Sequence, residues 1–158
     1  MCYLYWKNYN VPTVSLRYFT VYGPRQRPDM AIYKFVKAIL EENEIPVFGD
    51  GTQTRDFTFV DDAVEATVLT VGNNLVGEVF NIGGGSRISV NELIKLLEEL
   101  TGKEGRVKYV EKQKGDVKDT LADVSKASEF LHWIPKVDIS VGLKSFMEWF
   151  ITQFDEAK

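Results

Sequence analysis

Apolar residues recur along this chain in two patterns, one typical of buried strands and the other typical of amphipathic helices. Short apolar runs bounded by glycine, proline or polar residues predict strands over residues 11–19, 45–48, 55–60, 77–82 and 106–111. Apolar positions at helical spacing predict helices over residues 2–9, 30–43, 63–72, 92–100, 125–131 and 140–154. Because strands and helices alternate, the pattern predicts the α/β fold class.

Some helix ends carry clear signals. Ser89 and Glu92 have the spacing of a capping box, in which each side chain binds the backbone N–H of the other residue. Gly102 is placed to end the helix that follows. Asp29 is placed to cap the helix over residues 30–43.

Composition limits the class of protein. A length of 158 residues with 44% apolar residues fits one globular domain over residues 1–158. Charges interrupt every apolar run, so no membrane segment is expected, and the net charge of -4 argues against nucleic-acid binding. A single cysteine, Cys2, and a single histidine, His132, leave no internal disulfide and no Cys/His zinc site. This cysteine usage predicts a cytoplasmic location.

The segment "NIGGGS" is the first candidate for chemistry. It follows a predicted strand and precedes a predicted helix, which is where phosphate-binding loops occur. However, it lacks the G-x-G-x-x-G spacing of a dinucleotide fingerprint, and no other segment of the chain has it. A tight structural turn is the favoured interpretation.

The segment "VFGDGTQTRDFTFVDD" is a stronger candidate. Arg55 stands at the start of a predicted strand, and a guanidinium group binds phosphate oxygens through paired charge-assisted hydrogen bonds. Phe48, just before a glycine turn, offers an aromatic face on which a base can stack. Alternatively, Arg55 pairs with Asp56, Asp61 or Asp62, and Phe48 belongs to the core. Local composition does not separate the two interpretations.

The polar segment "QKGDVKDT" contains Asp116. A carboxylate can accept hydrogen bonds from two neighbouring ribose hydroxyl groups. Gly-Asp is also ordinary turn chemistry, so this residue alone is a weak signal.

Four segments occur in order: "LRYFTVYGPRQRPDM", "GDGTQTRDFTFVDDAVEA", "FNIGGGSRISVNELI" and "KGDVKDTLADVSKA". Together they resemble the C-terminal half of the nucleotide-sugar epimerase/dehydratase family, the extended short-chain dehydrogenases. The resemblance reaches to about Ile151 and is nearest to the UDP-glucose and UDP-glucuronate 4-epimerases. It implies the C-terminal portion of a Rossmann-type fold with the substrate-binding subdomain, without the N-terminal NAD-binding part.

The resemblance implies a role for several residues at a nucleotide-sugar site. Arg55, in "TRDF", matches the arginine that holds the substrate diphosphate. Asp116, in "KGD", matches the carboxylate at the nucleotide ribose. Phe48, with its neighbours Pro46 and Val47, matches the segment that contacts the base.

Further positions follow from the same resemblance. Ala31 matches the start of the helix that lines the diphosphate pocket, and Tyr18 and Phe19 match the strand end beside the nicotinamide. Thr20 stands where many members have Asn, and it can still donate one hydrogen bond to the phosphates. Gln113 stands where many members have Arg, and an amide supplies no charge to the diphosphate.

Because Gln113 is uncharged, binding of the diphosphate is expected to depend more on Arg55.

Tyr3 and Lys7 have the Tyr-x-x-x-Lys spacing that is catalytic in this family. The catalytic lysine should lie roughly twenty residues before the arginine of "LRYF", which is several helical turns and a loop. Lys7 precedes Arg17 by only ten residues. The spacing therefore matches the tail of that helix, and no catalytic residue is expected in this chain.

We therefore expect the UDP-sugar-binding half of an NAD-dependent UDP-glucose 4-epimerase, which interconverts UDP-glucose and UDP-galactose. The Gly-rich NAD loop and the catalytic pair are expected before Met1, so this chain alone should bind no NAD and have no activity. The expected partners are a UDP-sugar, a complementing N-terminal half or a second copy, and no metal. Two alternatives stay open: half of a nucleotide-sugar 4,6-dehydratase or decarboxylase, and a non-catalytic module that binds a nucleotide sugar or a protein.

Overall fold

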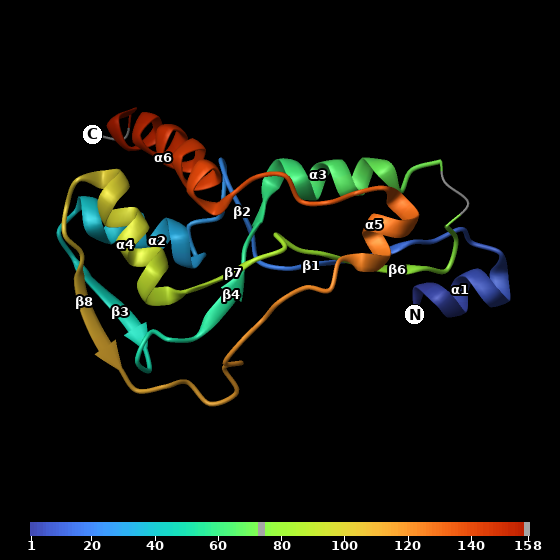
Figure 1. Ribbon diagram of the computed structural model, residues 1–158, viewed down its shortest axis with the longest axis horizontal. Coiled ribbons are helices and arrows are strands. Elements are labelled where there is room, and N and C mark those ends of the chain that lie inside the picture. The colour runs from blue at the N-terminus through green and yellow to red at the C-terminus, as the bar shows by residue number, and fades with distance from the viewer. Residues whose placement is uncertain (73–74, 157–158) are drawn as a thin grey trace. The chain divides into compact units, whose positions relative to one another are not determined.

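The computed structural model describes residues 1–72 and 75–156 (Figure 1). Its helices are α1 (Cys2–Tyr9), α2 (Ala31–Leu40), α3 (Val60–Leu69), α4 (Val90–Thr101), α5 (Ser125–Leu131) and α6 (Ile139–Glu156). Its strands are β1 (Ser15–Tyr18), β2 (Val21–Tyr22), β3 (Glu44–Phe48), β4 (Thr54–Asp56), β5 (Thr58–Phe59), β6 (Val79–Ile82), β7 (Arg87–Ser89) and β8 (Arg106–Val110). Helices and parallel strands in alternation confirm the predicted α/β class.

The chain divides into two compact units, and it passes between them several times. The first unit comprises Met1–Val21, Asp56–Ser86 and Leu121–Val137, and the second comprises Tyr22–Arg55, Arg87–Thr120 and Asp138–Lys158. That residues 1–158 act as one domain stays a prediction. It includes residues 73, 74, 157 and 158, which lie outside the described residues.

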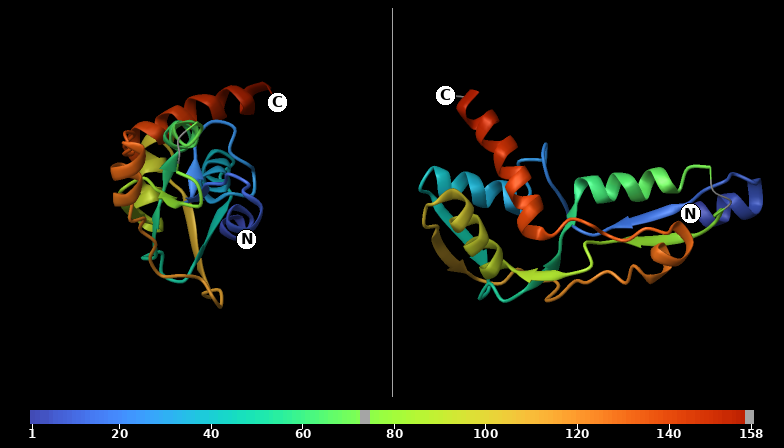
Figure 2. Two further views of the ribbon diagram at one scale, coloured as in Figure 1. Left: turned by 90° about the vertical axis from the view of Figure 1, so that its right-hand side faces the viewer. Right: turned by 45° about the horizontal axis from the view of Figure 1, so that its top comes forward.

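The first unit is built on two parallel strands. β1 pairs with β6 in the register Ser15↔Val79 to Tyr18↔Ile82, and Figures 1 and 2 show the two strands side by side. Its core joins residues of β6, α3, α5 and the segment after α5: Ala66, Phe80, Ile82, Ala127, Leu131 and Trp133. The buried Trp133 ring also donates a hydrogen bond from Nε1 to the carbonyl oxygen of Asp62 at 3.1 Å. The strand pair is thus covered by apolar helix residues, as the alternating sequence requires.

The second unit is built on another parallel pair. β3 pairs with β8 over five positions, from Glu44↔Arg106 to Phe48↔Val110. Burial alternates along β3: Ile45 and Val47 are buried, whereas Glu44, Pro46 and Phe48 are exposed. The core of this unit also takes apolar residues from the helices: Ile32, Val36 and Ile39 of α2, Leu93, Ile94 and Leu97 of α4, and Leu143, Phe146 and Phe150 of α6. The outer face of β3 is left for polar contacts and ligands.

Two of the predicted helix ends are confirmed and one is wrong. The amide of Glu92 donates to Ser89 Oγ at 3.2 Å, and the amide of Ser89 donates to the Glu92 carboxylate at 2.9 Å, which is the capping box. Gly102 ends α4 with φ 65°, a left-handed conformation. Asp29 does not cap α2, because Met30 occupies the N-cap position and Asp29 lies one residue before it, where its carboxylate pairs with Arg27 at 3.3 Å.

The predicted strand over residues 55–60 is divided in the structure. The amide of Thr54 donates to the Lys118 carbonyl at 3.0 Å, whereas the amide of Thr58 donates to the Thr20 carbonyl at 3.0 Å. The segment changes its hydrogen-bonding neighbour between these residues, at the boundary of the two units, so β4 and β5 are separate strands. Among the described residues, no helix has the length and apolar character needed to cross a membrane.

Candidate functional site

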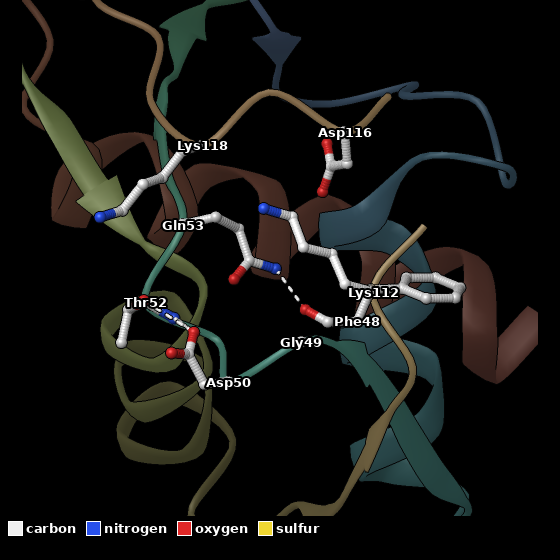
Figure 3. A pocket seen from close by; sticks show the side chains of 8 residues that line it. All are labelled: Phe48, Gly49, Asp50, Thr52, Gln53, Lys112, Asp116 and Lys118. Carbon is white, nitrogen blue, oxygen red and sulfur yellow. Dashed lines mark hydrogen bonds between the residues drawn. The ribbon is translucent and has the colours of Figure 1, made fainter. Parts of the chain in front are cut away.

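A pocket lies in the second unit, at the carboxyl end of β3. Its volume is about 360 Å³, and it is lined by residues that follow β3 and β8: Phe48, Gly49, Asp50, Thr52, Gln53, Lys112, Asp116 and Lys118 (Figure 3). Ligand sites often lie at the carboxyl ends of parallel strands, because the loops that follow different strands meet there. This pocket is therefore the candidate site of the second unit.

The aromatic wall of the pocket is Phe48. Its side chain is 39% exposed, so the alternative in which Phe48 belongs to the core is wrong. Its main-chain carbonyl oxygen accepts a hydrogen bond from Gln53 Nε2 at 2.8 Å, which holds the glutamine amide at the end of β3. Pro46 is exposed on the same face of β3, whereas Val47 is buried on the other face. Val47 can therefore reach a ligand only through its main chain.

Arg55 and Asp116 form an ion pair at the pocket. Arg55 donates to the Asp116 carboxylate at 2.5 Å, and the two side chains are 21% and 31% exposed. The same guanidinium group donates to the carbonyl oxygens of Thr54 at 2.8 Å and Lys118 at 3.2 Å. The partner of Arg55 is thus Asp116, not one of the aspartates near it in the sequence. Two residues that the sequence singled out separately are brought together.

Five further polar residues of the pocket were not predicted: Asp50, Thr52, Gln53, Lys112 and Lys118. The strand register carries a signal for Lys112, because Phe48 lies opposite Val110 and alternation places Lys112 on that same outer face. Lys118 comes from the "KGDVKDT" loop, where only Asp116 was chosen. A search for every cation in that loop would have found Lys118.

Asp50 is an acidic group at the edge of the pocket. The hydroxyl and amide groups of Thr52 donate to its carboxylate at 2.7 and 3.0 Å. These hydrogen bonds hold the pKa of Asp50 below its usual value, and the charge of Lys118 adds to the effect. Asp50 is therefore ionised and engaged at neutral pH.

Five predicted substrate residues of the second unit do not line this pocket: Arg55, Pro46, Val47, Gln113 and Ala31. Gln113 is exposed, and its carbonyl oxygen accepts the amide of Asp116 at 3.3 Å within the turn. Ala31 is the exposed first residue of α2. Their roles at a ligand stay predictions.

The residues predicted near the nicotinamide and phosphates lie in the first unit. The hydroxyl group of Tyr18 shares a hydrogen bond with Thr67 Oγ1 at 2.7 Å. The carbonyl oxygen of Phe19 accepts the hydroxyl of Thr58 at 3.0 Å, and the carbonyl oxygen of Thr20 accepts the amide of Thr58 at 3.0 Å. These contacts fix the end of β1, and they leave the predicted ligand roles untested.

The glycine segment does not fit the diphosphate of NAD. The amide of Gly84 donates to the buried carboxylate of Asp56 at 2.6 Å, and the other oxygen of Asp56 accepts the amide of Ala122 at 2.9 Å. A Cβ atom at Gly84 would overlap the carbonyl oxygen of Phe57, so this glycine allows close packing inside the unit. Burial raises the pKa of Asp56, although the two amide hydrogen bonds oppose the shift. The segment is a structural turn, in agreement with the favoured interpretation.

In α1, the amine of Lys7 lies over two aromatic rings. Lys7 Nζ is 4.2 Å from the centre of the Trp6 ring and 5.9 Å from that of the Tyr3 ring. This is a cation–π contact of the kind found on helix surfaces. Among the described residues there is also no group of three or more His, Cys, Asp or Glu side chains that could hold a metal ion.

Comparison with known proteins gives one family. The model of the NAD dependent epimerase/dehydratase family matches residues 1–83. The UDP-glucuronate 4-epimerase of Thermodesulfobacterium geofontis is 46% identical over 150 residues, which cover 94% of this chain and 46% of that protein.

Solved structures give the same result. The UDP-glucuronic acid 4-epimerase of Bacillus cereus, solved with UDP-glucuronic acid and NAD, superposes with a TM-score of 0.92 and 45% identity over 96% of this chain and 49% of its own. The UDP-glucose 4-epimerase of Thermotoga maritima, solved with UDP-glucose, gives a TM-score of 0.89 and 40% identity over 96% of this chain and 50% of its own. The chain thus spans about half the length of the relatives it matches.

Proposed function

This chain belongs to the NAD dependent epimerase/dehydratase family, and from this premise we propose that it is the UDP-sugar-binding half of a nucleotide-sugar 4-epimerase. The half in question is the C-terminal one, as the order of the sequence motifs suggests. The 4-epimerases among the similar proteins support this choice over a 4,6-dehydratase or decarboxylase. The sugar is glucose or glucuronic acid, the two that those relatives carry in their names.

The observation that carries the proposal is the Arg55–Asp116 ion pair beside Phe48. A nucleoside diphosphate offers a flat base, two ribose hydroxyl groups and a chain of anionic oxygens. An aromatic ring, a carboxylate and a guanidinium group are their respective partners. The pocket presents the ring and the carboxylate, and Arg55, which is bound to that carboxylate, belongs to the same unit.

Further substrate residues of the second unit extend the proposed site. Pro46 and the main chain of Val47 extend the surface for the base. Ala31 lies at the start of a helix, where a backbone N–H can bind an anion, and Gln113 offers a hydrogen bond to the phosphates. In the first unit, Thr20 is the residue proposed to donate a hydrogen bond to the phosphates.

The chemistry that this half contributes is positioning of the substrate. Binding of the nucleotide and diphosphate holds the reacting sugar carbon in place, so remote contacts lower the barrier at that carbon. Tyr18 and Phe19 form the proposed surface beside the nicotinamide. Because the glycine turn does not fit the NAD diphosphate, we assign no hydride step to the residues of this chain. We expect no epimerase turnover from the isolated chain with added NAD.

The protein partner in this proposal is a complementing N-terminal half or a second copy of the chain. α1 exposes three tyrosines, Tyr3, Tyr5 and Tyr9, which offer an aromatic surface for such a partner. Co-expression with a chain that carries the Gly-rich loop and the Tyr-x-x-x-Lys pair would test this part of the proposal. Turnover of UDP-glucose or UDP-glucuronate by the mixture, and by neither half alone, is the expected result.

The direct experiment is calorimetric titration of UDP, and separately of NAD, into the purified chain. We expect UDP to bind and NAD not to bind. Arg55→Ala should weaken UDP binding by roughly tenfold to a hundredfold, since charge-assisted hydrogen bonds contribute about 1.5–3 kcal/mol. Arg106→Ala is the matched control, because Arg106 is an exposed arginine at the start of β8, whereas the pocket lies beyond the end of that strand. No UDP binding by the wild-type chain would contradict the proposal.

A further inference from the structure

We infer that Lys112 is a phosphate-binding residue of this pocket and that the pocket selects a nucleoside diphosphate over an uncharged nucleoside. The inference rests on the proposed function, and it assigns to Lys112 the positive charge that binding of the diphosphate requires. Sequence comparison directs attention to Arg55 and to position 113, where Gln113 is neutral. The geometry of the pocket points instead to the residue before it.

The first step concerns the charge of Arg55. Its guanidinium group is already bound to the Asp116 carboxylate at 2.5 Å and to two carbonyl oxygens. The positive charge of Arg55 is therefore largely balanced before any ligand arrives. An incoming diphosphate needs a cation whose charge is not compensated in this way.

The second step separates the two lysines of the pocket. Lys118 acts on two carboxylates: its charge contributes to the lowered pKa values of Asp50 and Asp119, behind the hydrogen bonds from Thr52 and Thr54 respectively. Neither lysine forms an ion pair within residues 1–72 and 75–156, but only Lys118 acts on these carboxylates. Lys112 is thus the cation of the pocket with the least compensated charge.

The third step is the position of Lys112. In Figure 3 its side chain runs through the middle of the pocket, between Gln53 and Asp116. Its stem lies beside Gly49, since a Cβ atom built on that glycine would be 3.9 Å from Lys112 Cβ. The stem therefore begins at the strand end, and the amine lies between Gln53 and Asp116, the residue proposed to bind the ribose.

The net charge of the side chains at the pocket depends on Lys112. The pocket and Arg55 together hold three cationic side chains and two carboxylates, so the local balance is positive only as long as Lys112 is charged. Without Lys112 the balance is zero, and a diphosphate gains little over a neutral ligand. Uridine, which carries no phosphate, should not depend on this charge.

The test is calorimetric titration of UDP and of uridine into the whole chain and into two variants, Lys112→Met and Lys114→Met. Methionine keeps an apolar stem of similar length and removes only the charge. Lys114 is an exposed lysine of the same loop that does not line the pocket, so its variant makes the same change in net charge. Circular dichroism and urea midpoints should be equal for all three proteins.

We expect Lys112→Met to weaken UDP binding by roughly fivefold to fiftyfold, as for loss of a charge-assisted hydrogen bond, and to leave uridine binding unchanged. Lys114→Met should match the wild type for both ligands. Equal UDP affinity in Lys112→Met and wild type would overturn the inference while the proposed function stands. An equal loss in both variants, or a loss of uridine binding in Lys112→Met, would also overturn it. A wild-type chain that binds neither UDP nor uridine overturns the proposed function and this inference together.

Discussion

Arg55 donates to the carboxylate of Asp116 at 2.5 Å, although the two residues are 61 positions apart in the chain. The bond joins β4 to the loop that follows β8. Each side chain therefore occupies hydrogen-bonding groups of the other that a ligand would need. A phosphate that binds Arg55 competes with Asp116, and a ribose that binds Asp116 competes with Arg55.

Asp116→Asn tests this competition. Loss of the carboxylate charge releases the guanidinium group, so affinity for inorganic pyrophosphate should rise by about twofold to fivefold, the value of a partly exposed ion pair. Affinity for uridine should fall by roughly tenfold, because an amide is a weaker acceptor for ribose hydroxyl groups than a carboxylate. Calorimetry with the two ligands measures both effects. A fall in pyrophosphate affinity would show that Asp116 orients Arg55 and does not compete for it.

Phe48→Ala tests the aromatic wall. Stacking of a base on an aromatic ring is worth about 1–3 kcal/mol, so affinities for UDP and uridine should both fall by roughly fivefold to a hundredfold. Pyrophosphate binding should not change. Phe48→Tyr, which keeps the ring, is the control and should bind UDP and uridine with wild-type affinity. Loss of pyrophosphate binding in Phe48→Ala would mean that the ring maintains the loops of the pocket.

Ser89→Ala tests the capping box of α4. Removal of the hydroxyl group leaves the amide of Glu92 without its acceptor and should lower the free energy of unfolding by about 1 kcal/mol. Urea unfolding followed by circular dichroism measures the change. Ser86→Ala, at an exposed serine close by, should have no effect. Equal stability of both variants would show that α4 is held by its packing alone.

Asp56→Asn tests the buried carboxylate of the first unit. Both of its oxygens accept amide hydrogen bonds, and an asparagine side chain has only one acceptor oxygen. The unmatched amide should lower the free energy of unfolding by about 1–3 kcal/mol at neutral pH. Asp61→Asn, at an exposed aspartate of the first turn of α3, is the control and should change stability little.

The same pair of proteins gives a pH dependence. Burial raises the pKa of Asp56 in the folded state, so the native protein takes up this proton at a higher pH than the unfolded chain does. The contribution of Asp56 to stability therefore increases as pH falls from neutral through the folded pKa. The difference in unfolding free energy between wild type and Asp56→Asn, measured by urea at pH 7 and at about pH 5.5, should be larger at the lower pH. A smaller difference would mean that the amide hydrogen bonds outweigh burial.

Local signals in the sequence were sufficient to predict a contact where both partners are neighbours in the chain. Ser89 and Glu92 predicted their capping box because they are three positions apart. Asp29 was assigned wrongly because α2 begins one residue later than predicted, with Met30 at its N-cap. Neither outcome depends on distant parts of the fold.

The candidate site is different because its contacts join segments far apart in the sequence. No local pattern indicates that Arg55 pairs with Asp116, and the sequence offered the nearer aspartates as equal partners. Lys112 was overlooked because its position on the outer face follows from the β3–β8 register, which appears only in the folded chain. The family resemblance supplied Arg55 and Asp116 as separate residues, and the structure supplied their contact.

The pairing of β3 with β8 has a consequence for how this protein reaches its native state. The two strands close a loop that contains β4, β5, α3, β6, β7 and α4. Contacts of such high sequence separation require a large loss of chain entropy before they gain any stabilisation, and they slow folding. The pocket cannot exist before this loop closes, because its two walls follow the two strands. Ligand binding should therefore recover with the slowest phase of refolding, after much of the helical signal has returned.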